Sequence, residues 1–200
     1  MKTTPRKASA GFTLIELMAV ITIIVILAGL VVGGLGYVNE KSATSKAKVQ
    51  IALLSKALEE YKLDNGTYPP TGNLATPTTV SATTAGNSDV LFKALYWDSD
   101  NDNQGAAVGA TTGDTDQKIY LSDLDPATSK QGWTTGTASA TLKILDPWGN
   151  TYMYRTAKSS DGTANDKTQN PDFDLWSAGK NGKTNATPTH ADCRDDIKNF

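Results

Sequence analysis

One acidic residue at the start of a long apolar segment carries the most specific chemistry in the chain. Glu16 is the only charged residue in residues 12–38. A carboxylate at bilayer depth costs about 2.5–3.5 kcal/mol on insertion scales, so it requires a counter-ion. Hydrolysis of the bond between Gly11 and Phe12 would create one, a cationic α-amine on Phe12. Cleavage at this bond would therefore give Glu16 the cationic partner that it needs.

The residues before this bond form a short polar leader, residues 1–11, which contains Lys2, Arg6 and Lys7. These cations favour an N-terminus in the cytoplasm. An ordinary secretory signal has 7–15 apolar residues and a cleavage site after them, whereas here the expected cut precedes the apolar run. A plain N-terminal anchor would fit the length of residues 12–38. It would explain neither Glu16 nor the Gly-Phe junction.

A group of acidic residues near the middle of the chain invites a metal-binding interpretation. Asp98, Asp100 and Asp102 resemble the opening of an EF-hand calcium loop. That loop needs glycine at its sixth position and a bidentate acid at its twelfth, where this chain has Asn103 and Gly109. We favour a solvated loop here, and a second calcium site at the three aspartates is the alternative.

Composition excludes several other kinds of site. The chain has a single His and a single Cys, His190 and Cys193, so it lacks the four ligands of an ordinary zinc site. A lone cysteine excludes an internal disulfide, and we expect no catalytic activity. The net charge of -2 gives no electrostatic footprint for nucleic acid.

Helical periodicity continues beyond the apolar segment. Five apolar residues recur at spacings of four and three, which places them on one helix face: Ala47, Ile51, Leu54, Leu58 and Tyr61. Asn65-Gly66 and the following prolines end the pattern. We expect one helix over residues 12–64, with a transmembrane half at 12–38 and an amphipathic half that extends to the turn at 39–66.

Four glycines interrupt the apolar half of this helix: Gly29, Gly33, Gly34 and Gly36. Each costs about 1 kcal/mol relative to alanine in a helix interior. They either loosen the helix locally or let neighbouring anchors pack closely.

Residues 67–200 are expected to form a globular head. We expect a short helix, Asp89–Trp97, capped by Ser88 or Asp89, and a type I turn at 146–149. The expected strands are 118–121, 140–145, 151–155 and 172–176. Residues 71–117 read as a long variable loop. The predicted fold class is α+β, with a small antiparallel sheet packed on the amphipathic half of the helix.

The run Gly11-Phe12-Thr13-Leu14-Ile15-Glu16, followed by the apolar helix, resembles the class III signal of type IV pilins and pseudopilins. The resemblance implies a type IV pilin-like fold. It also implies that a membrane prepilin peptidase cuts after Gly11 and methylates the new terminus at Phe12. Glu16 would pair with the terminal amine of a neighbouring subunit during filament assembly.

Further blocks resemble the major pseudopilin of type II secretion and occur in the same order as in that family: residues 61–69, 146–152, 174–182 and 195–197. Members of that family bind calcium in a C-terminal loop, here residues 174–200. The implied ligands are the backbone carbonyls of Leu175 and Ser177 and the side chains of Asn181, Asp195 and Asp196. The chain departs from the family pattern at Asn181, where an aspartate is common, and in its longer final loop.

The resemblance implies a structural subunit that polymerises into a periplasmic filament and helps drive protein export. Its partners would be further copies of itself, the prepilin peptidase, minor pseudopilins, the inner-membrane assembly platform and membrane lipid. The subunit would cross the inner membrane once, with its head in the periplasm. The alternatives are a surface type IV pilus subunit for adhesion, motility or DNA uptake, and a membrane-anchored calcium-binding module that does not polymerise.

Overall fold

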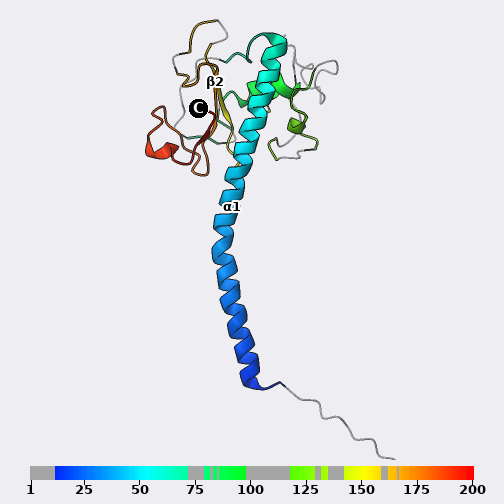
Figure 1. Ribbon diagram of the computed structural model, residues 1–200, viewed down its shortest axis with the longest axis vertical. Helices are drawn as coiled ribbons and strands as arrows, with labels where there is room; N and C mark the ends of the chain where they lie inside the picture. The colour runs from blue at the N-terminus through cyan, green and yellow to red at the C-terminus, as the bar shows by residue number, and fades with distance from the viewer. Residues whose placement is uncertain are drawn as a thin grey trace, which may run out of the picture. The chain divides into compact units, whose positions relative to one another are not determined.

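The computed structural model describes residues 12–71, 79–81, 83–84, 86–97, 118–128, 132–134, 142–158, 162–165 and 167–200. The chain divides into two compact units, residues 1–42 and 43–200. Helix α1, Leu14–Asn65, begins in the first unit and ends in the second (Figure 1). The predicted helix is therefore confirmed to within two residues at either end. Gly11 and the rest of the leader lie outside the described residues.

In the first unit, α1 exposes its apolar side chains. An 18-residue window of α1 has a mean hydropathy of 2.9, and none of that window is buried. By length and composition this part of the helix can cross a membrane. The helix runs without a break through Gly29, Gly33 and Gly36. A Cβ added at any of these three would meet no atom, so local loosening and close packing both stay open as explanations.

In the second unit, the remainder of α1 buries one apolar face. The five residues at the predicted spacing are all buried: Ala47, Ile51, Leu54, Leu58 and Tyr61. They belong to the same core cluster as Tyr152, Tyr154 and Leu175 from the sheet region. Gln50 is also buried, and its side-chain Oε1 accepts a 2.7 Å hydrogen bond from the Tyr152 hydroxyl, which offsets the cost of burying the amide. The amphipathic pattern thus identified the buried face correctly.

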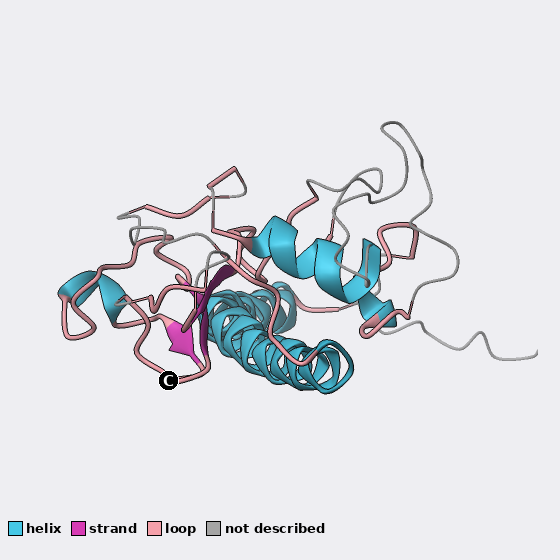
Figure 2. Cartoon of the chain, turned by 90° about the horizontal axis from the view of Figure 1, so that it is seen from above, coloured by secondary structure: helices cyan, strands magenta, loops and turns pink. Residues whose placement is uncertain are grey.

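The described residues form one antiparallel sheet in the order β1-β2-β3. The strands are β1 (Met153–Thr156), β2 (Phe173–Ser177) and β3 (Ile197–Lys198). Tyr154 pairs with Leu175, and Ser177 pairs with Ile197. The strands lie beside the helix when the chain is seen from above (Figure 2). This long helix with a small antiparallel sheet confirms the α+β class.

Both faces of the sheet are covered. Tyr154 and Leu175 belong to the core that includes α1. Met153 and Trp176 form a second cluster with Val80 and Ala178. Because every residue of β1 and β2 is buried, these strands lack the apolar–polar alternation of a half-exposed sheet.

The short helix within the segment 71–117 begins one residue earlier than predicted. It comprises α2, Ser88–Phe92, followed by a π-helical stretch, η1, Lys93–Trp97. The prediction of a Ser88 or Asp89 cap was wrong, because the N-cap is Asn87 in a left-handed conformation with φ 60°. The Asn87 side chain donates to the Tyr154 carbonyl at 2.9 Å instead of capping the helix. The start of α2 is therefore set by its attachment to β1.

Two predicted strands are wrong where the structure describes them. At 118–121 the backbone N–H groups of Tyr120 and Leu121 both donate to the Leu95 carbonyl, so they do not join the sheet. A 3-10 helix, η2, Ser122–Leu124, follows directly. In the segment 140–145, of which 142–145 are described, Leu145 makes only an isolated bridge to Thr151. The predicted final strand, 172–176, is confirmed as β2.

The predicted turn at 146–149 joins this bridge to β1 and is held by one buried carboxylate. Asp146 Oδ1 accepts from the backbone N–H groups of Trp148 and Asn150 at 3.0 and 2.9 Å. Its Oδ2 accepts a 2.5 Å hydrogen bond from the Ser177 hydroxyl on β2. Burial raises the pKa of Asp146, although these hydrogen bonds oppose the rise. Asp146 thus ties the turn to the sheet.

Asp146→Ala should destabilise the second unit by about 2–4 kcal/mol, because partly buried donors lose their acceptor. Asp146→Asn keeps a side-chain oxygen for these donors and should cost clearly less. A raised folded-state pKa means that the stabilisation from protonation is full below about pH 3.9 and is lost as pH rises through the folded-state value. The asparagine variant should lose this part of the pH dependence. Urea unfolding at several pH values measures both effects, and equal losses in the two variants would contradict this role.

Candidate functional sites

The N-terminal site is organised by a reciprocal capping contact at the start of α1. Thr13 donates to Glu16 Oε2 through both its backbone N–H, at 2.9 Å, and its hydroxyl, at 2.7 Å. The Glu16 backbone N–H approaches the Thr13 hydroxyl oxygen at 3.4 Å. This is a capping box, in which a threonine and a glutamate three residues later satisfy donors that the first helical turn leaves open. Glu16 therefore also fixes where the helix begins.

The Glu16 carboxylate lies at the end of the helix, where another partner could reach it. Phe12 is 85% exposed and immediately precedes the capping box. A carboxylate in the first helical turn is also favoured by the helix dipole. Sequence reasoning identified Phe12 and Glu16 but missed Thr13, although the T-x-x-E pattern is a known helix-start signature.

The C-terminal loop brings two of the predicted metal ligands together. Asp195 Oδ2 accepts from the Asn181 backbone N–H at 2.9 Å. Gly179, at φ +63°, allows this approach, because a Cβ there would collide with the Asp195 carbonyl and carboxylate. The Asn181 side chain bonds elsewhere, with its Nδ2 donating to the Asp192 carbonyl and its Oδ1 accepting from the Lys183 N–H. Asn181 and Asp195 are thus neighbours, joined through the loop backbone.

Asp196 lies in a different environment. Its side chain is fully buried, and its Oδ2 accepts from the Thr184 hydroxyl at 2.9 Å and lies 3.3 Å from Lys198 Nζ. Burial raises the pKa of Asp196, while Thr184, Lys198 and the Cys193 thiol oppose the rise. The other oxygen, Oδ1, is buried and makes no hydrogen bond within the described part of the chain.

The two predicted carbonyl ligands come from β2. The Leu175 carbonyl already accepts from the Asn199 N–H at 3.1 Å. Ser177 pairs with Ile197 across β2 and β3. The Asp98, Asp100 and Asp102 group lies outside the described residues.

The donor chemistry fits calcium. The loop offers carboxylate, amide and carbonyl oxygens, which are the ligands that this ion prefers. The orphaned Oδ1 of Asp196 is an oxygen that a bound cation would satisfy. Among the residues that the structure describes, no three acidic, His or Cys side chains converge on one point. Carboxylates alone therefore do not make this site, and the amide and carbonyl oxygens would have to complete it.

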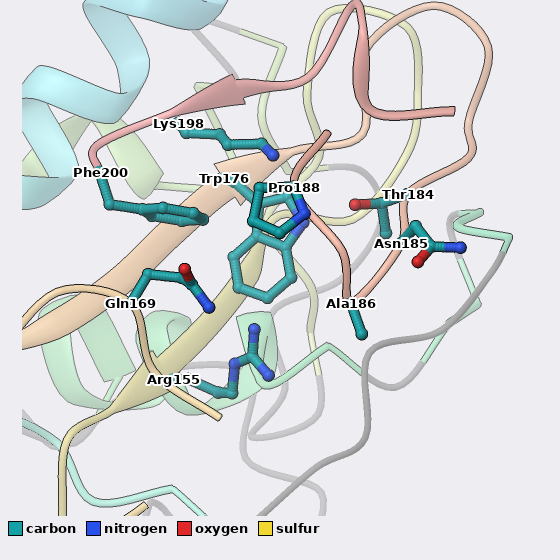
Figure 3. Close-up of a pocket in the computed structure, with 9 residues that line it drawn as sticks. All are labelled: Arg155, Gln169, Trp176, Thr184, Asn185, Ala186, Pro188, Lys198 and Phe200. Carbon is teal, nitrogen blue, oxygen red and sulfur yellow. The ribbon is translucent and has the colours of Figure 1, made fainter. Parts of the chain in front are cut away.

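A small pocket lies against the face of β2 that carries Trp176, opposite the face on which Leu175 packs in the core with α1 (Figure 3). Arg155 stacks on Trp176, with its guanidinium carbon 4.8 Å from the ring centroid. The Arg155 side chain is almost fully buried and lies 3.8 Å from the carboxylate of Asp174, its partner in the strand register. Lys198 lines the same pocket. The cavity measures about 20 Å³, so it has room for about one water molecule.

Comparison with known proteins covers nearly all of the chain. Residues 6–32 match the family profile of the prokaryotic N-terminal methylation motif. Residues 35–88 and 114–196 match the profile of protein G of the type II secretion system (T2SS). The first match includes Gly11, Phe12 and Glu16. The second includes the amphipathic half of the helix, strands β1 and β2 and most of the C-terminal loop.

Individual relatives agree with these matches. The chain is 31% identical over 191 residues to the type II secretion system core protein G of Pseudomonas aeruginosa, covering 94% of each chain. It is 48% identical over 66 residues to the protein of the same name from Aeromonas hydrophila, covering 33% of this chain and 46% of that protein. The Escherichia coli protein of that name is 52% identical over 61 residues, 30% of this chain and 42% of its own length. From its two profile matches and its full-length relative, this chain belongs to the protein G family of the type II secretion system.

Proposed function

We propose that this chain is the major subunit of the type II secretion pseudopilus, a filament that grows from the inner membrane into the periplasm and helps drive protein export. The observation that carries the proposal is the joint presence of a methylation motif and a protein G domain in one chain. The α+β fold supports a structural subunit, with a long helix to polymerise and a packed head.

The proposed topology follows from the first unit of the chain. Helix α1 crosses the inner membrane once, with the cationic leader in the cytoplasm and the head in the periplasm. The prepilin peptidase removes residues 1–11 and methylates Phe12. The processed subunit then meets further copies of itself, the minor pseudopilins and the inner-membrane assembly platform. Membrane lipid surrounds the apolar half of α1 until the subunit is taken into the filament.

In the proposed assembly step, Glu16 exchanges one partner for another. In the single subunit its carboxylate accepts from Thr13. In the filament it pairs with the Phe12 amine of a neighbouring subunit. A cationic amine is the stronger partner in a low-dielectric environment, so the exchange favours the assembled state.

Secretion itself separates this function from that of a surface pilus. Deleting the gene should stop the release of type II substrates and leave them folded in the periplasm, and a plasmid copy should restore release. Normal secretion combined with lost surface pili, twitching or DNA uptake would overturn the proposal in favour of a type IV pilus subunit. Normal behaviour in all these assays would favour a calcium-binding module that does not polymerise.

We further propose that the C-terminal loop binds calcium through Asn181, Asp195 and Asp196, with backbone carbonyls of Leu175 and Ser177. A bound ion would join the loop to β2 and the segment before β3. The loop has no disulfide to hold it, because Cys193 is the only cysteine of the chain. Calcium would supply this cross-link. The neighbouring Asn181 and Asp195 and the orphaned Asp196 oxygen support the proposal.

Chelation should lower the melting temperature of the full chain in detergent. A ligand that binds only the folded state stabilises it by about 2.7 kcal/mol at a hundredfold excess over its Kd. All four tryptophans lie in the second unit, so tryptophan fluorescence reports its melting. Asp195→Ala or Asp196→Ala should abolish the effect, and a triple Asp98/Asp100/Asp102→Ala variant should retain it. Loss of the calcium effect in the triple variant alone would show that the ion binds at residues 98–102 and not in the C-terminal loop.

A further inference from the structure

The two adjacent aspartates of the C-terminal loop have different partners. Asp195 faces the backbone of Asn181, whereas Asp196 faces Thr184 and Lys198. Asp196 and Lys198 are two residues apart, on the extended segment that enters β3, so their side chains share one face. This chain therefore carries its own cation beside one of the proposed calcium ligands.

The Asp196–Lys198 pair is shielded from solvent. The exposed fractions of the two side chains are 0% for Asp196 and 17% for Lys198. A buried carboxylate requires compensation, and removing the partner of a buried ion pair leaves a charge that is strongly destabilising. Lys198 thus supplies neutralisation of the kind that a bound cation would provide.

Lys198 and Thr184 satisfy only one oxygen of the Asp196 carboxylate, so the other oxygen could bind a second cation. Lys198 and Thr184 both contact Oδ2 of Asp196, whereas Oδ1 is buried without a hydrogen bond in the described chain. A cation that binds Oδ1 would lie beside an ammonium group already paired with the same carboxylate. Like-charge repulsion then opposes simultaneous binding of both cations.

Lys198 has a second partner besides the Asp196 carboxylate. Its Nζ lies 5.5 Å from the ring centroid of Phe200, which places it within range of a cation–π interaction. Lys198 also lines the small pocket that contains Trp176 and Thr184 (Figure 3). The ammonium group therefore retains one favourable contact if it gives up the carboxylate.

We propose that Lys198 is a built-in competitor for the calcium site, an ammonium that neutralises Asp196 when calcium is absent and must give up this carboxylate when the ion binds. The inference rests on the calcium site proposed above. It makes Lys198 a residue that sets calcium affinity. It also means that the ion pair with Lys198 holds the segment leading to β3 in place at low calcium concentration. The same ion pair weakens the binding of calcium.

The test measures calcium affinity and calcium-free stability in the same variants. Full-length protein in detergent is titrated with Ca²⁺ by calorimetry and melted in chelator by tryptophan fluorescence. Lys198→Met should bind Ca²⁺ about tenfold more tightly, a change equal to about 1.4 kcal/mol, yet melt at a lower temperature than wild type in chelator. Lys198→Arg should resemble wild type in both assays. Lys158→Met, which removes an exposed lysine of the second unit outside this loop, should change neither.

Opposite changes in affinity and calcium-free stability distinguish competition from general damage, which would weaken both. If wild type binds Ca²⁺ and Lys198→Met binds it equally or less tightly, the competitor role is overturned and the calcium site stands. If wild type does not bind and Lys198→Met does, the competitor role stands and the wild-type calcium proposal fails. If neither protein binds Ca²⁺, both proposals are overturned.

Discussion

Glu16→Gln should reduce filament yield by more than about tenfold while leaving membrane insertion intact. Glutamine can replace glutamate in a capping box, so the start of α1 should be preserved. The substitution removes only the charge. Without it, the Phe12 amine of a neighbouring subunit has no anionic partner within the apolar environment, where an unpaired charge costs about 2.5–3.5 kcal/mol. Insertion should be unchanged or slightly favoured, because the variant carries no buried charge.

The measurement compares sheared filaments with the membrane fraction by immunoblot. Thr13→Ser keeps both the hydroxyl and the glutamate and should assemble like wild type. Glu16→Asp retains the charge on a shorter side chain and should recover part of the yield. Wild-type filament yield from Glu16→Gln would show that Glu16 acts through the capping box with Thr13 and not through its charge.

Gly11→Val should block processing and, with it, assembly. A β-branched side chain at the residue before the cut obstructs the close approach to the backbone that glycine permits. The precursor should keep its 11-residue leader. Phe12 would then have a peptide nitrogen in place of an amine, so Glu16 would have no cationic partner. The apolar helix is unaltered, so the uncut protein should still reach the membrane.

Intact mass spectrometry of membrane-extracted protein distinguishes the cut and uncut chains. Ala8→Val adds a similar side chain within the leader but leaves Gly11 in place, and it should be processed normally. Efficient removal of the leader from Gly11→Val would place the cleavage site elsewhere. Filaments built from uncut Gly11→Val subunits would refute the need for a free Phe12 amine.

Long-range regularity made the main elements predictable. Ala47, Leu54 and Tyr61 repeat along one face of α1, and the Asn65-Gly66 pair marks its end. A 52-residue helix gives many chances for such a pattern to appear. The strand β2 was also found, because its apolar residues are flanked by turn-forming residues. The burial of these segments then follows from the need to cover their apolar side chains.

The errors arise where tertiary contacts override local preference. Tyr120 and Leu121 have side chains suited to a strand, but their N–H groups bond to the Leu95 carbonyl. Asn87 begins α2 because its side chain is held by the Tyr154 carbonyl, a contact across 67 residues. Strand β3 spans only Ile197 and Lys198, which is too short for a periodic signal.

The candidate sites show the same division. Gly11, Phe12 and Glu16 form a compact motif whose chemistry follows from the sequence. The contacts within the C-terminal loop depend on the path of its backbone, which the spacing of residues in the sequence does not specify. Its Asn181–Asp195 contact requires the left-handed Gly179. The Asp196–Lys198 pair did have a signal, the shared face of residues two apart on an extended segment, but only their burial gives the pair its importance.

The N-terminus of the assembled subunit tests the central claim most directly. Filaments sheared from cells that overproduce this chain together with its secretion apparatus can be purified and analysed by mass spectrometry. We expect filaments composed mainly of this chain, beginning at a methylated Phe12 and absent from cells that lack the prepilin peptidase. Filaments whose subunits begin at Met1, or the absence of this chain from any filament, would contradict its role as a processed, polymerising pseudopilin.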